Sequence, residues 1–303
     1  MNKYDKKILV KLKSYGIDYG LENFQQLDEN GDSLLMLLIQ KDNTYKTKLQ
    51  KEDWDYLLKN SNLKQQNKSG YNAFMLAILN NQKGFKTANK WLTKDQWDYL
   101  IQHSDLKQQH KYLYNACMYA LQNNQEKSLN FSENQWDYLL KNSDLKQQDC
   151  SGSTILTTAL KQHNIENIHF SEDQWDYLIQ HSDIKQKDIS DWNQFIYIIK
   201  YYRNLFPMKN NLFQQCWNKL SKKEQQNTFL LICEESQYEE SKFLKEDIQY
   251  LLYDMKIVIS NHIKQKLLKN EILDILEMIK KRDLLFSLNN KLIHKDKRYI
   301  KKI

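Results

Sequence analysis

The sequence predicts an all-α fold, a helical-repeat solenoid of stacked helix-turn-helix units, on the basis of three observations. Trp-Asp-Tyr-Leu occurs four times, beginning at Trp54, Trp97, Trp136 and Trp175, with successive copies 43, 39 and 39 residues apart. A fixed period of this size is typical of repeat arrays, in which each unit packs on its neighbours. Six glycines and one proline in 303 residues favour helices joined by short loops. Hydrophobic residues make up 41% of the chain, which is enough for a core.

Each Trp-Asp-Tyr-Leu copy is predicted to lie near the start of a helix. Three copies carry a Ser or Thr with a Gln three residues later, which is the spacing of a capping box: Thr93 with Gln96, Ser132 with Gln135, and Ser171 with Gln174. In the first copy Gln50 stands at the cap position and is a poorer cap. An apolar residue before each cap and the Trp at the fourth helical position predict a hydrophobic staple. The Trp is therefore expected in the core between units.

Between successive Trp helices the sequence predicts a turn followed by another helix. A polar phrase such as Ser-Asp-Leu-Lys-Gln-Gln leads into a turn, and an apolar run follows it. These runs are Ser33–Gln40, Tyr71–Asn80, Tyr114–Asn123 and Ser153–Gln162. Each unit thus contains a first helix after the turn and a second helix that carries the Trp. We expect about five to six units with atypical terminal caps.

Four regions follow from this pattern. Residues 1–21 are predicted to be an N-terminal capping helix, 22–190 the regular repeats, 191–255 degenerate helical repeats, and 256–303 a C-terminal helical cap with a basic tail. In the degenerate region, Cys216–Asn227 is expected to repeat the Trp helix and its Gln-Gln tail. The last ten residues are expected to lack regular structure.

The turn and first helix resemble the ankyrin repeat. In Ser143–Leu160, Asp144, Leu145, Asp149 and Gly152 lie at positions that match that repeat. The tetrapeptides that begin at Asn72 and Asn115 occupy the Thr-Pro-Leu-His position, but they lack its Pro and His, so its hydrogen-bonded helix start is not expected. The resemblance covers about residues 20–190 and implies stacked helix pairs that bind another protein. The Lys-, Asn-, Gln- and Ile-rich composition resembles that of ankyrin proteins of AT-rich intracellular bacteria, which implies a role as an effector delivered into a host cell. The four scattered cysteines favour reduced thiols in a cytoplasmic protein.

No catalytic, cofactor or metal site is predicted. His103 and His181 precede Asp105 and Asp183 by two residues, but Asn stands at the equivalent position of the other copies, which favours a helix-end role. The four cysteines form no Cys-x-x-Cys pair, so neither a zinc site nor a disulfide framework is indicated. Glycine is too rare for a phosphate-binding loop. We therefore predict a protein that is not an enzyme, with no membrane span.

The binding surface is predicted on the turns and first helices. The Trp helix is nearly identical between copies, whereas the turn and first helix vary, and a binding surface can differ from unit to unit. The candidates for partner binding are Lys68, Tyr71, Lys111, Tyr112, Tyr114 and Trp192.

An alternative function is nucleic-acid binding by aromatic stacking together with the basic C-terminal end. Residues 251–303 hold 13 basic and 6 acidic side chains, a surplus equal to the net charge of +7 of the whole chain. The basic tail candidates are Lys280, Lys281, Arg282, Lys295, Lys297 and Arg298. The sequence does not identify the partner or the oligomeric state.

Overall fold

The structure is a computed structural model. It describes residues 3–14, 24–41, 49–82, 92–124, 129, 131–164, 168–201, 211–235, 248–255 and 257–300. The chain divides into two compact units, Met1–Asp191 and Trp192–Ile303. Among the described residues, helices joined by turns form nearly all of the regular structure.

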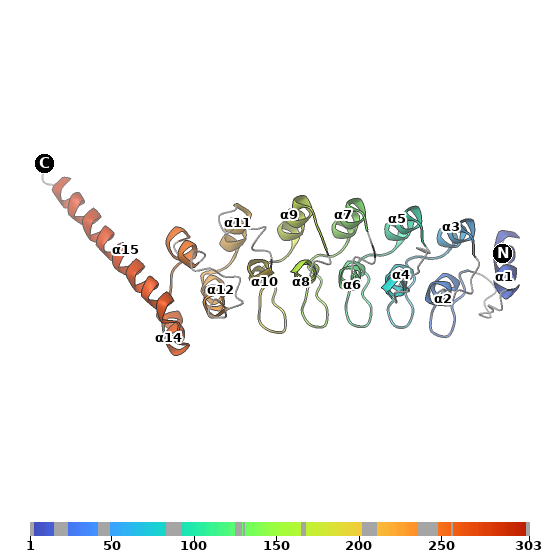
Figure 1. Ribbon diagram of the computed structural model, residues 1–303, viewed down its shortest axis with the longest axis horizontal. Coiled ribbons are helices and arrows are strands. Elements are labelled where there is room, and N and C mark those ends of the chain that lie inside the picture. Colours follow the sequence, from blue (N-terminus) through green and yellow to red (C-terminus); the bar gives the residue numbers. More distant parts are fainter. Residues whose placement is uncertain are drawn as a thin grey trace. The chain divides into compact units, whose positions relative to one another are not determined.

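The first compact unit contains two rows of helices (Figure 1). The inner row holds the first helices, α2 (Leu34–Lys41), α4 (Ala73–Gln82), α6 (Ala116–Asn123) and α8 (Ile155–Asn164). The outer row holds the Trp helices, α3 (Lys51–Asn60), α5 (Lys94–His103), α7 (Glu133–Asn142) and α9 (Glu172–His181). Each helix packs on the next helix of its own row. The predicted fold class, an all-α stack of helix pairs, is confirmed.

The inner helices form the core of the stack. Residues 34–39, 73–78, 116–121 and 155–160 are all buried, because each inner helix packs on its neighbours in the row and on the outer row. The four Trp side chains are between 1% and 8% exposed, so their predicted place in the core is confirmed. Burial of this many apolar side chains is what stabilises helices of about three turns that would be marginal alone.

The predicted starts of the outer helices are confirmed. Thr93, Ser132 and Ser171 are N-caps, and each forms a capping box with the Gln three residues later. The staple is also present, since the rings of Phe131 and Trp136 lie 5.4 Å apart. Phe131 also lies 5.3 Å from Trp97 of the previous unit, and Phe170 lies 5.5 Å from Trp136. Each Phe therefore joins two successive Trp side chains.

Helix α1 (Lys3–Ser14) packs against α3 at the start of the stack. Its buried residues are Ile8 and Leu12. Lys11 forms an ion pair with Asp53, and the Tyr56 hydroxyl donates to Asp5 at 3.0 Å. These contacts cover the side of α3 on which no earlier outer helix packs.

The second compact unit contains α10 (Gln194–Tyr201), α11 (Asn211–Lys219), α12 (Lys222–Glu235), the π-helical turn η3 (Tyr250–Asp254), α14 (Asn261–Lys269) and α15 (Leu273–Ile300). Phe195, Phe213 and Trp217 pack together, with ring centroids 5.1 to 6.2 Å apart. No described helix of the chain combines the length and the apolar character needed to cross a membrane.

Two expectations for this unit were wrong. Gln225 and Gln226 do not form a tail after a helix but lie inside α12, because Ser221 and Glu224 form reciprocal cap hydrogen bonds that start a new helix there. Of the last ten residues, 294–300 are helical, since α15 continues to Ile300, and 301–303 lie outside the described residues.

Candidate functional site

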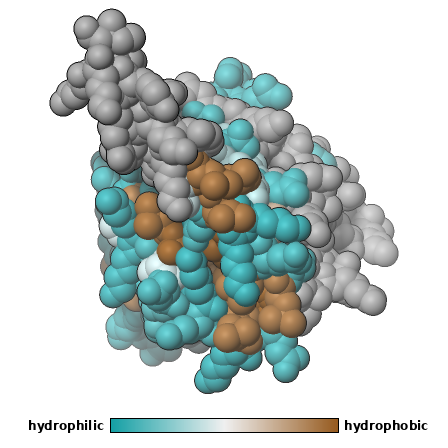
Figure 2. Space-filling model, turned by 90° about the vertical axis from the view of Figure 1, so that its left-hand side faces the viewer, coloured by the Kyte–Doolittle hydropathy of each residue, from teal (hydrophilic) through white to brown (hydrophobic). Residues whose placement is uncertain are grey.

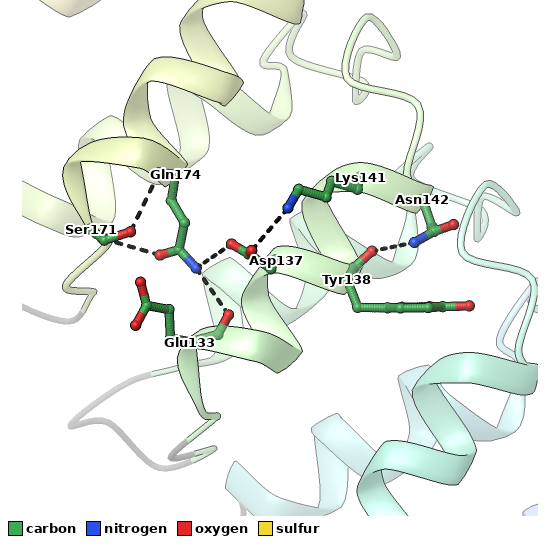
Figure 3. A network of polar contacts seen from close by, with 7 residues as sticks. All are labelled: Glu133, Asp137, Tyr138, Lys141, Asn142, Ser171 and Gln174. Carbon is green, nitrogen blue, oxygen red and sulfur yellow. Dashed lines mark hydrogen bonds and ion pairs between the residues drawn. The ribbon is translucent and has the colours of Figure 1, made fainter.

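The near-identical outer helices owe their similarity to contacts between units. Figure 3 shows Gln174, whose side chain accepts from the Ser171 N–H and donates to Asp137 of α7, the preceding outer helix, at 2.8 Å. Gln135 donates in the same way to Asp98, and Gln96 to Asp55, each at 2.7 Å. The capping Gln therefore starts its own helix and also binds the Asp of Trp-Asp-Tyr-Leu in the preceding unit. Although burial alone would raise the pKa of Asp137, the hydrogen bonds from Gln174 and Lys141 lower it below its usual value.

The Lys-Gln-Gln phrases also join the units. The first Gln of each phrase donates a hydrogen bond to the backbone carbonyl of the Lys in the preceding unit, as Gln108 does to Lys64 at 2.8 Å. The second Gln donates to a backbone carbonyl of the following unit, as Gln109 does to Gln148 at 3.3 Å. Gln147, Gln186, Gln66 and Gln148 repeat these two patterns. Backbone carbonyls between units thereby gain hydrogen-bond partners.

The turns between units form five stacked fingers, which we define as residues 28–32, 67–71, 110–114, 149–153 and 188–191. Figure 1 shows them extending from the inner row on the side away from the outer row. The first residue of each finger accepts backbone N–H groups two or four residues later; these residues are Asp28, Asn67, His110, Asp149 and Asp188. One backbone hydrogen bond joins each finger to the next, as from Lys111 N–H to Ser69 O at 3.1 Å. The finger backbone is thus fixed, whereas its outward side chains can vary.

Each finger needs one residue with positive φ. Gly70 and Gly152 supply it in two fingers, and a Cβ there would lie only 2.6 and 2.7 Å from the Cα of the residue that begins the next finger. Leu113 takes this position in the third finger with φ 64°. A leucine is strained in this backbone conformation.

The inner helices begin with side-chain hydrogen bonds, which corrects the expectation drawn from the missing Pro and His. Asn72 and Asn115 accept from the N–H groups of Met75 and Met118, both at 3.0 Å. Each Asn also donates to a carbonyl of the next unit, at Asp105 and Asp144 respectively. The Asn side chain therefore caps the start of each of these helices by a hydrogen bond that needs neither Pro nor His.

The helix-end role of His103 and His181 is confirmed. The Nδ1 atoms of both lie 2.8 Å from the carbonyl oxygen four residues earlier. Asn60 and Asn142 donate to the equivalent carbonyls at 2.8 Å. Histidine and asparagine are interchangeable here because each places one N–H at the same distance from its backbone.

Five of the six partner-binding candidates lie on the second and third fingers. Lys68, Lys111 and Tyr112 are exposed, while Tyr71 and Tyr114 are half-buried. Tyr71, Tyr112 and Tyr114 surround the His110 ring, with centroid distances of 5.0, 5.6 and 5.1 Å. The sixth candidate, Trp192, belongs to the second compact unit and packs beside Tyr197 at 5.6 Å. The structure brings these five residues together within the first compact unit.

A polar cavity of about 360 Å³ opens beside Lys68 and Tyr71. No local sequence pattern indicates this cavity, because its walls come from two successive fingers and the inner helices behind them. The remaining lining residues are Asn30, Asp32, Gln40, Asn67, Ser69, Leu76, Leu79 and Asn80.

The first helices do not share this surface over most of their length, contrary to our expectation. Their variable residues are buried between neighbouring helices, so the variation reflects core packing. The candidate surface is therefore confined to the fingers and to the helix ends that line the cavity, including Gln40 and Asn80.

The three C-terminal basic candidates whose side chains the structure describes differ in exposure. Arg282 is 4% exposed and donates to the Ile257 carbonyl and to Asp283, so it is a structural residue and not a free cation. Lys280 and Lys281 are exposed, whereas the side chains of Lys295, Lys297 and Arg298 lie outside the described residues. The described stretch after Arg282 is apolar and exposed at Leu284, Leu285, Phe286 and Leu288. Figure 2 shows hydrophobic groups among hydrophilic ones at this end of the chain.

Within the described residues, no group of three or more His, Cys, Asp or Glu side chains is placed to hold a metal ion. Cys117, Cys216 and Cys233 are buried, and Cys150 is exposed on the fourth finger. Burial raises the pKa of the Cys117 thiol to about 12, so that thiol stays protonated at neutral pH.

Comparison with family models gives no match, and comparison with curated proteins gives none either. Among solved structures, the chain is similar to the crystal structure of the ankyrin repeat domain of Bcl-3, described as a unique member of the IkappaB protein family. The two are 13% identical, the match covers 69% of this chain and 78% of that one, and the TM-score is 0.40. A likeness at this level supports no inference about partners.

Proposed function

We propose that this chain is a protein-interaction scaffold that binds its partner through the fingers of its repeats. The proposal rests on a difference between the side chains that hold the units together and those on the fingers. The repeated residues, such as Gln135 and Asp98, are engaged within the stack, whereas the side chains at the second position of each finger, such as Lys68 and Lys111, differ from finger to finger and are exposed. A rigid frame with variable outward residues is the arrangement that a recognition surface requires.

Nucleic-acid binding remains the second candidate, and the exposed Lys280 and Lys281 favour it. It has less support, because Arg282 is buried and the following exposed side chains are apolar. A function as an effector delivered into a host cell, a cytoplasmic location and the absence of catalysis remain predictions from the sequence.

An affinity capture experiment tests the scaffold proposal. The whole chain, immobilised at one end, is exposed to a cytosolic lysate with and without nuclease treatment, and bound proteins are identified by mass spectrometry. We expect a saturable protein partner whose capture survives nuclease treatment. Capture that disappears with nuclease would contradict the proposal and favour the nucleic-acid alternative.

A further inference from the structure

The second and third fingers differ from the other three in charge. The position directly after the first residue of each finger is exposed in all five fingers. In order, it is occupied by Glu29, Lys68, Lys111, Cys150 and Ile189. Only the second and third fingers are basic at this position. Because Lys111 N–H bonds to Ser69 O, these two fingers are held side by side.

Neither lysine is neutralised by a side chain in the part of the chain that the structure describes. Among the described residues, no ion pair involves Lys68 or Lys111. The Lys111 ammonium lies 4.9 Å from the centre of the Tyr112 ring, a cation–π contact that orients the charge without cancelling it. Two positive charges are therefore available to a ligand.

Tyrosine side chains beside these lysines are held in fixed positions. His110 is 3% exposed and contacts the rings of Tyr71, Tyr112 and Tyr114, and Tyr119 lies 5.3 Å from it below. Tyrosines that are already ordered lose little entropy on binding, which is why rigid tyrosines make effective contact residues.

The lining of the cavity beside Lys68 is suited to an aromatic side chain that carries a polar group, such as a tyrosine of the partner. Leu76 and Leu79 supply apolar lining, and the amides of Asn30, Gln40 and Asn80 supply polar lining. Asp32 is also in the lining, 5% exposed and bound by the Asn67 amide at 2.8 Å. A carboxylate inside the cavity would be repelled by Asp32, so carboxylates are expected at the rim, near Lys68 and Lys111.

We propose that the second and third fingers bind an acidic, tyrosine-containing segment of the partner protein. Carboxylates of this segment pair with Lys68 and Lys111, and one aromatic side chain enters the cavity that lies between the second finger and the first. The inference rests on the proposed function and specifies the chemistry of the partner.

A nucleic acid fits this surface less well than an acidic peptide. The basic patch spans two fingers, and acidic residues flank it on both sides: Asp28, Glu29 and Asp32 in the first finger, and Asp149, Asp188 and Asp191 in the last two. A polyanion that follows the fingers would meet these carboxylates, whereas a short peptide segment would not. The tyrosine rings also contact His110, mostly edge-on, instead of offering an open row of faces for bases.

The test uses a fluorescein-labelled peptide of alternating glutamate and tyrosine, a matched peptide with lysine in place of glutamate, and a single-stranded oligonucleotide. Fluorescence anisotropy at low salt measures their affinity for the whole chain. We expect the glutamate peptide to bind at least about tenfold more tightly than the lysine peptide. Lys68→Glu with Lys111→Glu should weaken its binding by about tenfold, since two exposed charge contacts are reversed.

The control reverses two other exposed lysines, Lys107→Glu with Lys146→Glu, which changes the net charge equally but leaves the fingers intact. The control should weaken peptide binding by less than about twofold. An equal loss in both variants, or tight binding of the oligonucleotide that Lys68→Glu with Lys111→Glu abolishes, would overturn the proposal.

Failure of this inference is separable from failure of the scaffold. If the Lys68→Glu, Lys111→Glu variant captures the same lysate protein as the natural chain, the finger assignment is wrong and the scaffold proposal stands. If the lysate yields no protein partner, the scaffold proposal fails, and the peptide affinities still decide the finger assignment.

Discussion

At the scale of single residues, His110 stands where the other fingers carry Asp or Asn. Its Nδ1 accepts the Tyr112 N–H at 2.8 Å, which requires a neutral imidazole with the proton on Nε2. Burial lowers the pKa of His110, and the nearby Lys111 charge adds to this effect. The surrounding titratable groups, Lys111 and the tyrosines, supply no negative charge that would favour the imidazolium.

This pKa shift makes the third finger sensitive to acid. A folded-state pKa below the unfolded value means that the stabilisation is complete above about pH 6.5 and decreases as the pH falls below it. We expect the free energy of unfolding to decrease between pH 7.5 and pH 5.5, and His110→Asn to remove part of that decrease while keeping the turn. Urea unfolding of both proteins at the two pH values measures it. An unchanged pH dependence in His110→Asn would contradict the proposed role of the imidazole.

Leu113 offers a second test at this scale. Because its φ is 64°, Leu113→Gly should stabilise the chain by about 0.5–1 kcal/mol through relief of backbone strain. Gly152→Ala should have the opposite effect, since the new Cβ would lie 2.7 Å from the Asp188 Cα. Thermal unfolding of both variants measures the difference, and a destabilised Leu113→Gly would show that the leucine side chain contributes more than its backbone costs.

At the scale of helices, the capping Gln explains why Trp-Asp-Tyr-Leu and its flanks recur together. Gln135→Glu keeps a carboxylate oxygen for the Ser132 N–H but replaces the amide that donates to Asp98 at 2.7 Å. Two carboxylates would then face each other, so we expect a loss of about 1–2 kcal/mol. Asp98→Asn in the same chain should recover most of it. A double-mutant cycle by urea unfolding measures the coupling, and additive effects would exclude this contact as a link between units.

Removal of a Trp side chain from an outer helix is expected to destabilise the chain more than the Gln135→Glu substitution. Trp136→Ala removes a side chain that is 6% exposed and contacts Phe131 and Phe170, so it should cost about 3–5 kcal/mol. Tyr138→Ala on the same helix is the control, because Tyr138 is half-buried and its hydroxyl makes one hydrogen bond, to the Gln102 carbonyl at 3.3 Å. Equal losses in thermal melts would contradict the assignment of Trp136 to the core between units.

Helix starts and the Trp core could be predicted from the sequence because both depend on local spacing. Ser132 with Gln135 specifies a cap, and the Trp four residues after the cap specifies the buried face. The cavity and the finger cluster could not be predicted, because Lys68, Gln40 and Asn80 meet only through the stacking of units. Sequence variation in the inner helices led to the wrong prediction that these helices form part of the binding surface. A buried helix can also vary in sequence when the residues packed against it vary with it.

At the scale of the whole molecule, the scaffold and nucleic-acid functions differ in what they require of the C-terminal end. In helix α15, Leu284, Leu285 and Leu288 are exposed in the stretch before Lys291. Arg282 and Asp283 lie before that point, and Asp283 is bound by Lys264 at 2.6 Å. A truncation that ends at Asn290 therefore keeps these contacts and removes the most basic part of the chain.

If the basic end binds phosphates, the logarithm of the affinity for duplex DNA should fall with the logarithm of salt concentration, with a slope of about −0.9 per phosphate neutralised. Truncation after Asn290 should then flatten that slope. We expect instead that the truncated chain keeps its affinity for the acidic peptide and unfolds at nearly the same temperature, because the fingers and the buried Arg282 are retained. Anisotropy titrations at several salt concentrations, together with a thermal melt, measure both properties. A steep slope in the intact chain that the truncation abolishes would assign the C-terminal end to nucleic-acid binding and make the finger surface a secondary site.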